Sequence, residues 1–315
     1  MTAITHIIKI LIMKQRTLLE IAKFLKTEDL ELRKKAYCRL VESIDNLSDK
    51  VLSELVSILE DKDCQANVTE ILSRYGLNHM FSSEVQVMLV RLLAKKNCQI
   101  AVKKIFSLYY GLKYTRNLSD EAEVEIVSLL IKDDCPKVIK DFFWEYVETY
   151  TLDTWYVPYY RNLSDKALSK LVDCLEDKMY QDEVKAILLR YIDHSRGYRR
   201  NPSLSHALLP KHQLQLVNLL KKQEHQDVAK EILLKYADSF CIRLSKAAEV
   251  KLIYLLWSKN CRNLAKEILM KHAKNCGLSN KGKAQFDILL KFVRLFKTQN
   301  CKVELSGFYT KLQLA

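Results

Sequence analysis

The sequence of 315 residues predicts an all-α fold, an α-solenoid of about seven to eight stacked two-helix repeats. Three observations predict it. A segment such as LSDKVLSELVSILEDKDC, which starts at Leu47, occurs seven times in related forms. Apolar residues return within it at intervals of three and four, the period of a helix with one buried face. Glycine and proline, with six and four residues, form about 3% of the chain against about 12% on average, which favours helices with short connections.

Each repeat begins at an apolar residue that we count as position 0. These residues are Leu47, Phe81, Leu118, Leu163, Leu208, Leu244 and Leu278. The intervals between them are 34, 37, 45, 45, 36 and 34 residues, and a more divergent unit runs from Thr17 to Val41. Residues 1–16 are expected to form a leader helix or extension, residues 17–300 the repeats, and residues 301–315 a cap over the last repeat.

The first helix of each repeat is expected to start just after position 1. A serine at this position can accept a hydrogen bond from a free backbone N–H group and so cap the helix. Such serines are Ser48, Ser119, Ser164, Ser245 and Ser279. In the repeat from Leu208, Pro210 takes the first helical position, where proline is tolerated.

The second helix follows a polar break, and Pro136 is expected to begin it in the repeat from Leu118. Positions 17, 21, 24, 25 and 28 lie on one face of this helix and predict its buried stripe. Position 17 is cysteine in four repeats, and position 28 is tyrosine in five repeats and His272 in another. We therefore expect these cysteines and tyrosines, as well as His225 and His272, to build the core.

The divergent first unit, LEIAKFLKTEDLELRKKAYCRLV, resembles a HEAT repeat, because Asp29 and Arg33 open its second helix as they do in that family. The later units lack this pair and are similar to HEAT/armadillo hairpins in general. The resemblance covers about residues 17–300. It implies a binding scaffold with its second helices on a concave surface, and it does not identify the partner.

Position 22 forms a lysine row that the fold does not require. Its members are Lys103, Lys140, Lys185, Lys230 and Lys266. The position lies about 110° from the centre of the buried stripe, at the shoulder of the second helix. The row suits a repeating anion such as a phosphate backbone, or an acidic extended peptide. Alternatively, the lysines are solvated and their stems cover apolar surface.

Two insertions, near residues 147–162 and 192–207, account for the long intervals. The first contains Trp155, Tyr156, Tyr159, Tyr160 and Arg161. The second contains Arg196, Tyr198, Arg199 and Arg200. Insertions on successive repeats usually emerge on the same face, and aromatic residues beside arginines can anchor a protein or stack on bases. Alternatively, the aromatic residues pack the insertion onto the repeats and the arginines are merely exposed.

No catalytic, metal-binding or cofactor-binding motif is found. The segment GLSNKGKA nearly fits a phosphate-binding loop, but Ala284 replaces the required Ser or Thr and the segment is in register with the repeats. No apolar stretch reaches about 18 residues, so no membrane span is expected. The nine cysteines lack CxxC spacing and no secretory signal precedes them, which favours a reducing cytoplasmic location.

With 51 Lys and Arg against 38 Asp and Glu, the net charge of +13 either indicates an acidic partner or is incidental. We expect a non-enzymatic scaffold that binds a protein partner through its concave face and the two insertions, with no small-molecule substrate. The alternative is nucleic-acid binding by the lysine row and the arginines of the second insertion. A third hypothesis, a HEAT-like DNA glycosylase, depends on Asp153 near Trp155 alone.

Overall fold

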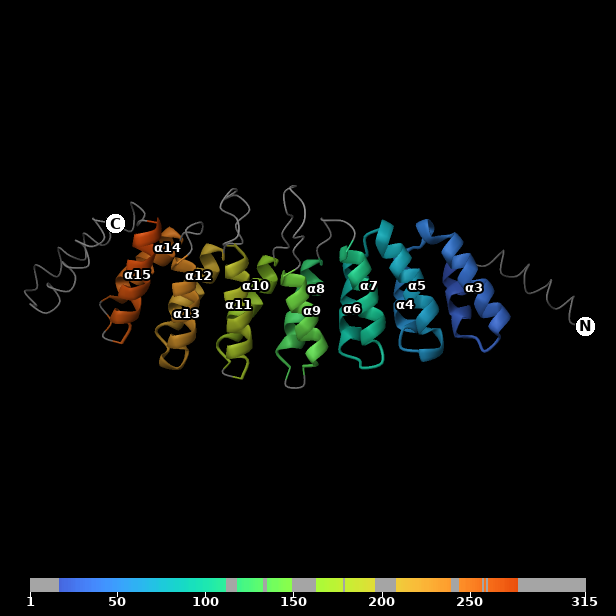
Figure 1. Cartoon of the computed structure of the whole chain (residues 1–315), viewed down its shortest axis with the longest axis horizontal. Helices are drawn as coiled ribbons and strands as arrows, with labels where there is room; N and C mark the ends of the chain where they lie inside the picture. The colour runs from blue at the N-terminus through green and yellow to red at the C-terminus, as the bar shows by residue number, and fades with distance from the viewer. Residues whose placement is uncertain are drawn as a thin grey trace, which may run out of the picture. The chain divides into compact units, whose positions relative to one another are not determined.

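The computed structural model describes residues 17–111, 118–132, 135–148, 163–177, 179–195, 208–238, 244–256, 258 and 260–276 (Figure 1). Within these residues the fold is all-helical and contains no strand. The chain divides into two compact units, residues 1–164 and 165–315, which we describe separately. The expected leader, the repeat from Leu278 and the C-terminal cap lie outside the described residues.

Unit 1 alternates between the first and second helices of successive repeats. The first helices are α2 (Leu18–Lys23), α4 (Asp49–Ile58), α6 (Ser83–Leu93) and α8 (Asp120–Leu130). The second helices are α3 (Leu30–Glu42), α5 (Lys62–Asn78), α7 (Gln99–Gly111) and α9 (Lys137–Glu148). Two short 3-10 helices, η1 (Phe24–Lys26) and η2 (Ile44–Asn46), lie in the connections.

Unit 2 continues the same alternation. Its first helices are α10 (Asp165–Cys174), α12 (Pro210–Leu219) and α14 (Lys246–Leu255). Its second helices are α11 (Gln181–Ser195), α13 (Gln226–Ala237) and α15 (Arg262–Cys276), and the 3-10 helix η4 (Gln223–His225) precedes α13.

Within each unit, helices pack against the other helix of their repeat and against the corresponding helix of the next repeat. In unit 1, α4 contacts α5 and α6, and α5 contacts α7. In unit 2, α11 contacts α13, which contacts α15, while α10, α12 and α14 pack in the same way. Within each unit, first helices therefore form one layer and second helices another (Figure 1). The predicted all-α fold, with helices packed against their neighbours, is confirmed.

The predicted helix starts are largely correct. The hydroxyl groups of Ser119 and Ser245 accept hydrogen bonds of 3.2 Å from the backbone N–H three residues later, as an N-cap requires. Ser48 occupies the same place before α4 but forms no side-chain capping bond. Pro210 is the first residue of α12, as expected. Pro136 lies one residue before α9, which begins at Lys137.

The predicted core is confirmed at most of its described positions. Position 0 is buried in every described repeat, from Leu47 to Leu244. The tyrosines of position 28 are buried as well, and His272 replaces them in the repeat from Leu244 without any exposure. Three of the four cysteines at position 17 are buried, and Cys135 is half-buried.

Asp29 and Arg33 lie at the start of α3, the second helix of the divergent first unit. The Asp29 carboxylate accepts two backbone N–H groups, each at 3.1 Å, and caps α3. Arg33 donates from Nε and Nη2 to the carbonyl oxygen of Thr27, at 3.1 and 2.7 Å. The pair therefore holds the turn between α2 and α3. None of the described helices has the length and apolar character that crossing a membrane requires.

Candidate interaction surface

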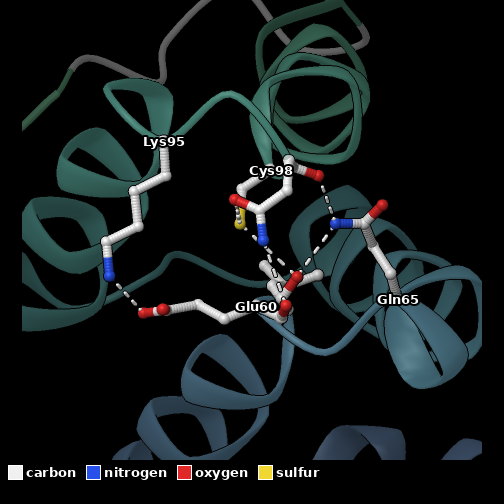
Figure 2. A network of polar contacts seen from close by, with 6 residues as sticks. Glu60, Gln65, Lys95 and Cys98 are labelled. Atoms are coloured by element: carbon white, nitrogen blue, oxygen red, sulfur yellow. Dashed lines mark hydrogen bonds and ion pairs between the residues drawn. The ribbon is translucent and has the colours of Figure 1, made fainter.

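Some polar side chains join neighbouring repeats and are therefore not available to a partner. One such contact lies where α4 ends (Figure 2). The carbonyl oxygen of Leu59 accepts from Gln65 Nε2 at 2.9 Å and from the thiol of Cys98, in the next repeat, at 3.4 Å. Gln65 Nε2 also donates to the carbonyl oxygen of Asn97 at 2.8 Å. These bonds satisfy a carbonyl group that the helix end would leave free.

The same contact recurs along the chain. Cys64 donates to the carbonyl oxygen of Leu25 at 2.9 Å, and Cys261 donates to that of Leu220 at 3.1 Å. Burial raises the pKa of the Cys64 and Cys98 thiols, so both keep the proton that they donate. Cys64, Cys98 and Cys261 are therefore structural rather than reactive, as the repeat predicts.

A Lys–Glu ion pair joins neighbouring repeats at equivalent positions in both units. Lys95 Nζ lies 2.6 Å from Glu60 Oε1, as Figure 2 shows, and Lys222 Nζ lies 2.8 Å from Glu176 Oε2. Each pair joins position 14 of one repeat to position 13 of the preceding repeat. These lysines therefore serve the stacking of repeats, although their exposed position limits the stabilisation to about 1 kcal/mol or less per pair.

A second contact between repeats uses a buried polar side chain at position 5. Its members are Gln86, Glu123, Gln213 and Glu249. Gln213 donates from Nε2 to the carbonyl oxygen of Leu208 at 2.7 Å and accepts from the backbone N–H of Ser245 at 2.6 Å. Gln86 makes the same two bonds, to Phe81 and Ser119. We call this arrangement the position-5 clasp.

For Glu123, Gln213 and Glu249, the position-5 clasp also binds the side chain at position 28. Tyr236 OH lies 2.9 Å from Gln213 Nε2, and His272 Nε2 lies 3.0 Å from Glu249 Oε1. The repeat pattern did not lead us to predict the clasp, although the sequence contains one indication of it. Position 5 lies in an apolar stripe and is leucine in two other repeats, Leu52 and Leu168. A glutamine or glutamate at a position that periodicity buries requires a hydrogen-bond partner.

Glu123 is the acidic version of the clasp in unit 1. Its Oε1 accepts from Tyr146 OH at 2.7 Å and its Oε2 accepts from the backbone N–H of Ser164 at 2.6 Å. Tyr146 OH in turn accepts from the backbone N–H of Leu118 at 3.1 Å. Burial raises the pKa of Glu123 despite these stabilising bonds. The carboxyl group is committed to the fold, and no reactant could reach it.

The five lysines of the predicted row lie half-buried at the shoulder of α7, α9, α11, α13 and α15. Two of them form ion pairs with the next repeat. Lys185 Nζ lies 3.2 Å from Glu231 Oε2, and Lys230 Nζ lies 2.7 Å from Glu267 Oε2. The hydrogen bond to Glu231 raises the pKa of Lys185. These contacts and the half-buried stems favour the structural interpretation of these two lysines.

Lys103 has a different environment. Within the described part of the chain, neither its ammonium group nor that of the adjacent Lys104 forms a hydrogen bond or ion pair. The residue after the row is acidic in most repeats, including Glu70, Asp141, Glu231 and Glu267, whereas α7 has Lys104. The row therefore contains lysines of two kinds, which the sequence pattern alone does not separate.

The excess of positive over negative charge in this protein does not lie on the described residues. Of the 51 Lys and Arg, 19 lie outside the described residues, which leaves 32 within them. Of the 38 Asp and Glu, only five lie outside, which leaves 33. The described residues are thus close to neutral, and the remaining segments carry the excess.

Most of each insertion lies outside the described residues. This includes all of their predicted site residues, from Trp155 to Arg161 and from Arg196 to Arg200. Their predicted roles stay predictions. Across the described residues, no group of three or more His, Cys, Asp or Glu side chains is placed to hold a metal ion.

Comparison with known proteins assigns no family. No protein-family model matches the chain, and no curated protein matches it. Among solved structures, it is similar to a crystal structure described as an engineered protein and a structural-genomics target. The two share 15% identity, with 94% of this chain and 88% of that chain covered and a TM-score of 0.27. A score this low implies neither a shared fold nor a shared function.

Proposed function

We propose that this protein is a non-enzymatic scaffold, an α-solenoid of the HEAT/armadillo-like kind, that binds a protein partner through its layer of second helices and the two insertions. The recurring contacts between repeats support the solenoid, since they join each repeat to its neighbour at equivalent positions. The Asp29 and Arg33 arrangement supports the HEAT-like assignment.

The ion pairs within the lysine row are the main reason to propose a protein partner rather than nucleic acid. Binding to nucleic acid gains its affinity from protein cations that neutralise phosphates. Lys185 and Lys230 already pair with glutamates of the next repeat, so a phosphate would have to displace those carboxylates. A near-neutral, ion-paired surface is more typical of a protein interface, where complementary charges provide specificity.

Nucleic-acid binding is the second candidate, and one observation favours it. The segments outside the described residues contain 19 basic residues and five acidic ones, including Arg196, Arg199 and Arg200. In this case the second insertion, rather than the lysine row, would contact the phosphates. Affinity would then fall log-linearly and steeply with salt concentration.

Two measurements on the full chain test the proposal. The first is cross-linking in an extract of source cells, followed by mass spectrometry, with the wild type and the triple variant Trp155→Ala, Tyr156→Ala, Tyr159→Ala. We expect a captured protein whose recovery falls in the variant, because buried aromatic anchors dominate protein interfaces. Unchanged recovery of every captured protein would count against the role of the insertions.

The second measurement is an electrophoretic mobility shift with duplex DNA, single-stranded DNA and RNA at low and near-physiological salt. We expect any shift to disappear at near-physiological salt. Tight binding that persists there, and that is lost in the triple variant Arg196→Gln, Arg199→Gln, Arg200→Gln, would replace the protein-scaffold proposal with the nucleic-acid alternative.

A further inference from the structure

Helix α7 departs from the other second helices at three positions that point away from the buried stripe. Position 19 is small or polar in the other repeats, where it is Ala66, Lys137, Asp182, Asp227 or Asn263. In α7 it is Ile100. Position 27 is charged in the other repeats, where it is Arg74, Glu145, Arg190, Lys235 or Lys271. In α7 it is Leu108, and position 23, acidic in four other repeats, is Lys104.

These substitutions lie together on one face. Ile100 is 85% exposed, and Lys103 and Lys104 follow it at three and four residues, the spacing at which helix side chains are neighbours. Leu108, half-buried, lies one turn beyond Lys104. We call Ile100, Lys103, Lys104 and Leu108 the α7 face.

The α7 face has unpaired positive charge. Helix α7 contains no Asp or Glu, and neither Lys103 nor Lys104 forms an ion pair with another described residue. Its neighbour α5 shows the usual pattern of the repeat, since Arg74 Nη2 lies 2.6 Å from Glu70 Oε1 on the same helix. In α7, by contrast, nothing among the described residues neutralises the two ammonium groups.

Neither feature alone would identify a binding surface, since single exposed apolar residues and solvated lysines are common. Their combination on one face is more informative. An apolar side chain flanked by two free cations matches a chain segment with an apolar side chain flanked by carboxylates. The apolar contact would supply affinity, and the charges would supply orientation and the choice of partner.

We propose that the α7 face is a docking surface for a short acidic segment of a partner protein, one that places an apolar side chain on Ile100 and Leu108 and carboxylates on Lys103 and Lys104. This inference rests on the proposed scaffold function and specifies the chemistry of the partner. Glu70 on α5 and Asp141 on α9 occupy the position that Lys104 takes on α7, so these two second helices of unit 1 would repel the same carboxylates.

A protein segment fits this face better than nucleic acid does. A phosphate backbone would need cations that continue from one second helix to the next. In unit 2 the row is interrupted, because Lys185 and Lys230 pair with Glu231 and Glu267. A charged stretch confined to one helix, beside an exposed isoleucine, suits a short amphipathic segment.

Fluorescence anisotropy with the full chain tests this inference. The probe is a short labelled peptide of alternating leucine and glutamate, and a leucine–glutamine peptide and a duplex DNA oligonucleotide serve as comparisons. We expect the double variant Lys103→Glu, Lys104→Glu and the single variant Ile100→Ser each to weaken binding of the acidic peptide by about tenfold or more. The leucine–glutamine peptide should bind the wild type at least about tenfold more weakly.

The matched control is the double variant Lys221→Glu, Lys246→Glu, which changes the net charge equally at two exposed lysines of unit 2. We expect its affinity for the acidic peptide to stay within about twofold of the wild type, because neither lysine belongs to the α7 face and salt screens exposed charges that make no direct contact. Circular dichroism and the thermal midpoint confirm that every variant is folded.

Several results would overturn the inference. They are no binding of the acidic peptide to the wild type, equal weakening in the control variant, or stronger binding of duplex DNA through the same residues. The scaffold function itself is tested separately. If cross-linked partners are lost in the insertion variant but retained in the α7 variants, the scaffold stands and the α7 face is not its docking surface.

Discussion

Buried thiols act as hydrogen-bond donors in this protein, and their neighbours explain why. Cys64, Cys98 and Cys261 each donate to a carbonyl oxygen at the end of a helix in the preceding repeat. The repeat pattern predicts that these residues are buried but cannot identify the acceptor. That acceptor belongs to a different repeat, and its distance depends on how two hairpins stack.

Burial of the thiols predicts the order in which they react. In native protein treated with a small alkylating reagent, Cys38, which is exposed, should be modified before the buried cysteines of the described residues. Cys64, Cys98 and Cys261 should remain unmodified until unfolding, because they are buried, and burial raises the thiol pKa of the first two. Peptide mass spectrometry over a time course measures the order, and modification of Cys98 before Cys38 would contradict it.

His212 predicts a loss of stability in acid. It is fully buried on α12, with its Nε2 2.9 Å from Ser169 Oγ on α10. Burial, aided by the adjacent Lys211, lowers the pKa of His212 below the ordinary value for histidine. Because the folded pKa is lowered, its contribution to stability is complete above the unfolded pKa and declines as the pH falls through that value.

The test is urea unfolding between pH 8 and pH 5 (about the range in which histidine titrates), with the wild type and His212→Asn. We expect the wild type to lose more free energy of unfolding over this range than the variant, whose side chain does not titrate. Parallel pH profiles for the two proteins would show that His212 does not cause the acid sensitivity.

At the scale of the element, the position-5 clasp holds three of the described helical hairpins to the start of the next. Gln213 contacts three other structural features, namely the start of its own repeat at Leu208, the second helix at Tyr236 and the next repeat at Ser245. Glutamine and glutamate bind the position-28 tyrosine in opposite directions. The carboxylate of Glu123 accepts a hydrogen bond from Tyr146 OH, whereas the amide of Gln213 donates one to Tyr236 OH. The acceptor for the next repeat's N–H is common to both.

Replacing Gln213 with leucine should therefore destabilise the protein, although leucine has a similar volume and occurs at the same position in other repeats. The backbone N–H of Ser245 would lose its acceptor, a loss of about 1–3 kcal/mol in the free energy of unfolding. Hydrogen exchange should show faster exchange of the Ser245 amide. The matched control is Leu216→Met, an apolar change of similar volume on the same helix, for which exchange at Ser245 should be unchanged.

At the scale of the whole molecule, the distribution of charge matters more than its sum. A net charge of +13 suggests a basic protein, but the described helices contain nearly equal numbers of acidic and basic residues. Many of the basic residues on these helices form ion pairs between repeats. Such pairs neutralise charge locally and create no field that attracts anions at long range. The basic excess belongs to the segments outside the described residues.

This distribution predicts the effect of removing the paired lysines. The double variant Lys185→Gln, Lys230→Gln should leave any duplex DNA affinity and its salt dependence unchanged, because both side chains already pair with glutamates. Removing a free phosphate contact would instead reduce the salt slope by about one. Mobility shifts at several salt concentrations measure that slope, and a reduced slope in this variant would favour the nucleic-acid alternative.

Much of the fold follows from local sequence. The period of the apolar residues, the serines at position 1 and Pro210 together locate the helices, because each depends on backbone geometry within a few residues. The buried stripe, including its cysteines and tyrosines, follows from the same period. In the divergent first unit, Asp29 and Arg33 fix the start of α3 through bonds that are also local.

The candidate surface is less predictable from sequence. The pattern places five lysines in one row but cannot distinguish Lys185 and Lys230, which are paired, from Lys103, which has no partner among the described residues. The position of Ile100 in the repeat is visible in the sequence, but its exposure is a property of the folded surface.

The sequence by itself thus determined the helices, their buried faces and the repeat, because periodicity and capping act over one or two helical turns. Only the tertiary structure decided which polar side chains join the repeats and which remain available to a partner. Glu231, the carboxylate that pairs with Lys185, and Ser245, whose N–H binds Gln213, both lie in the following repeat. Such contacts depend on the stacking of hairpins, and no local pattern encodes the distance between two stacked side chains.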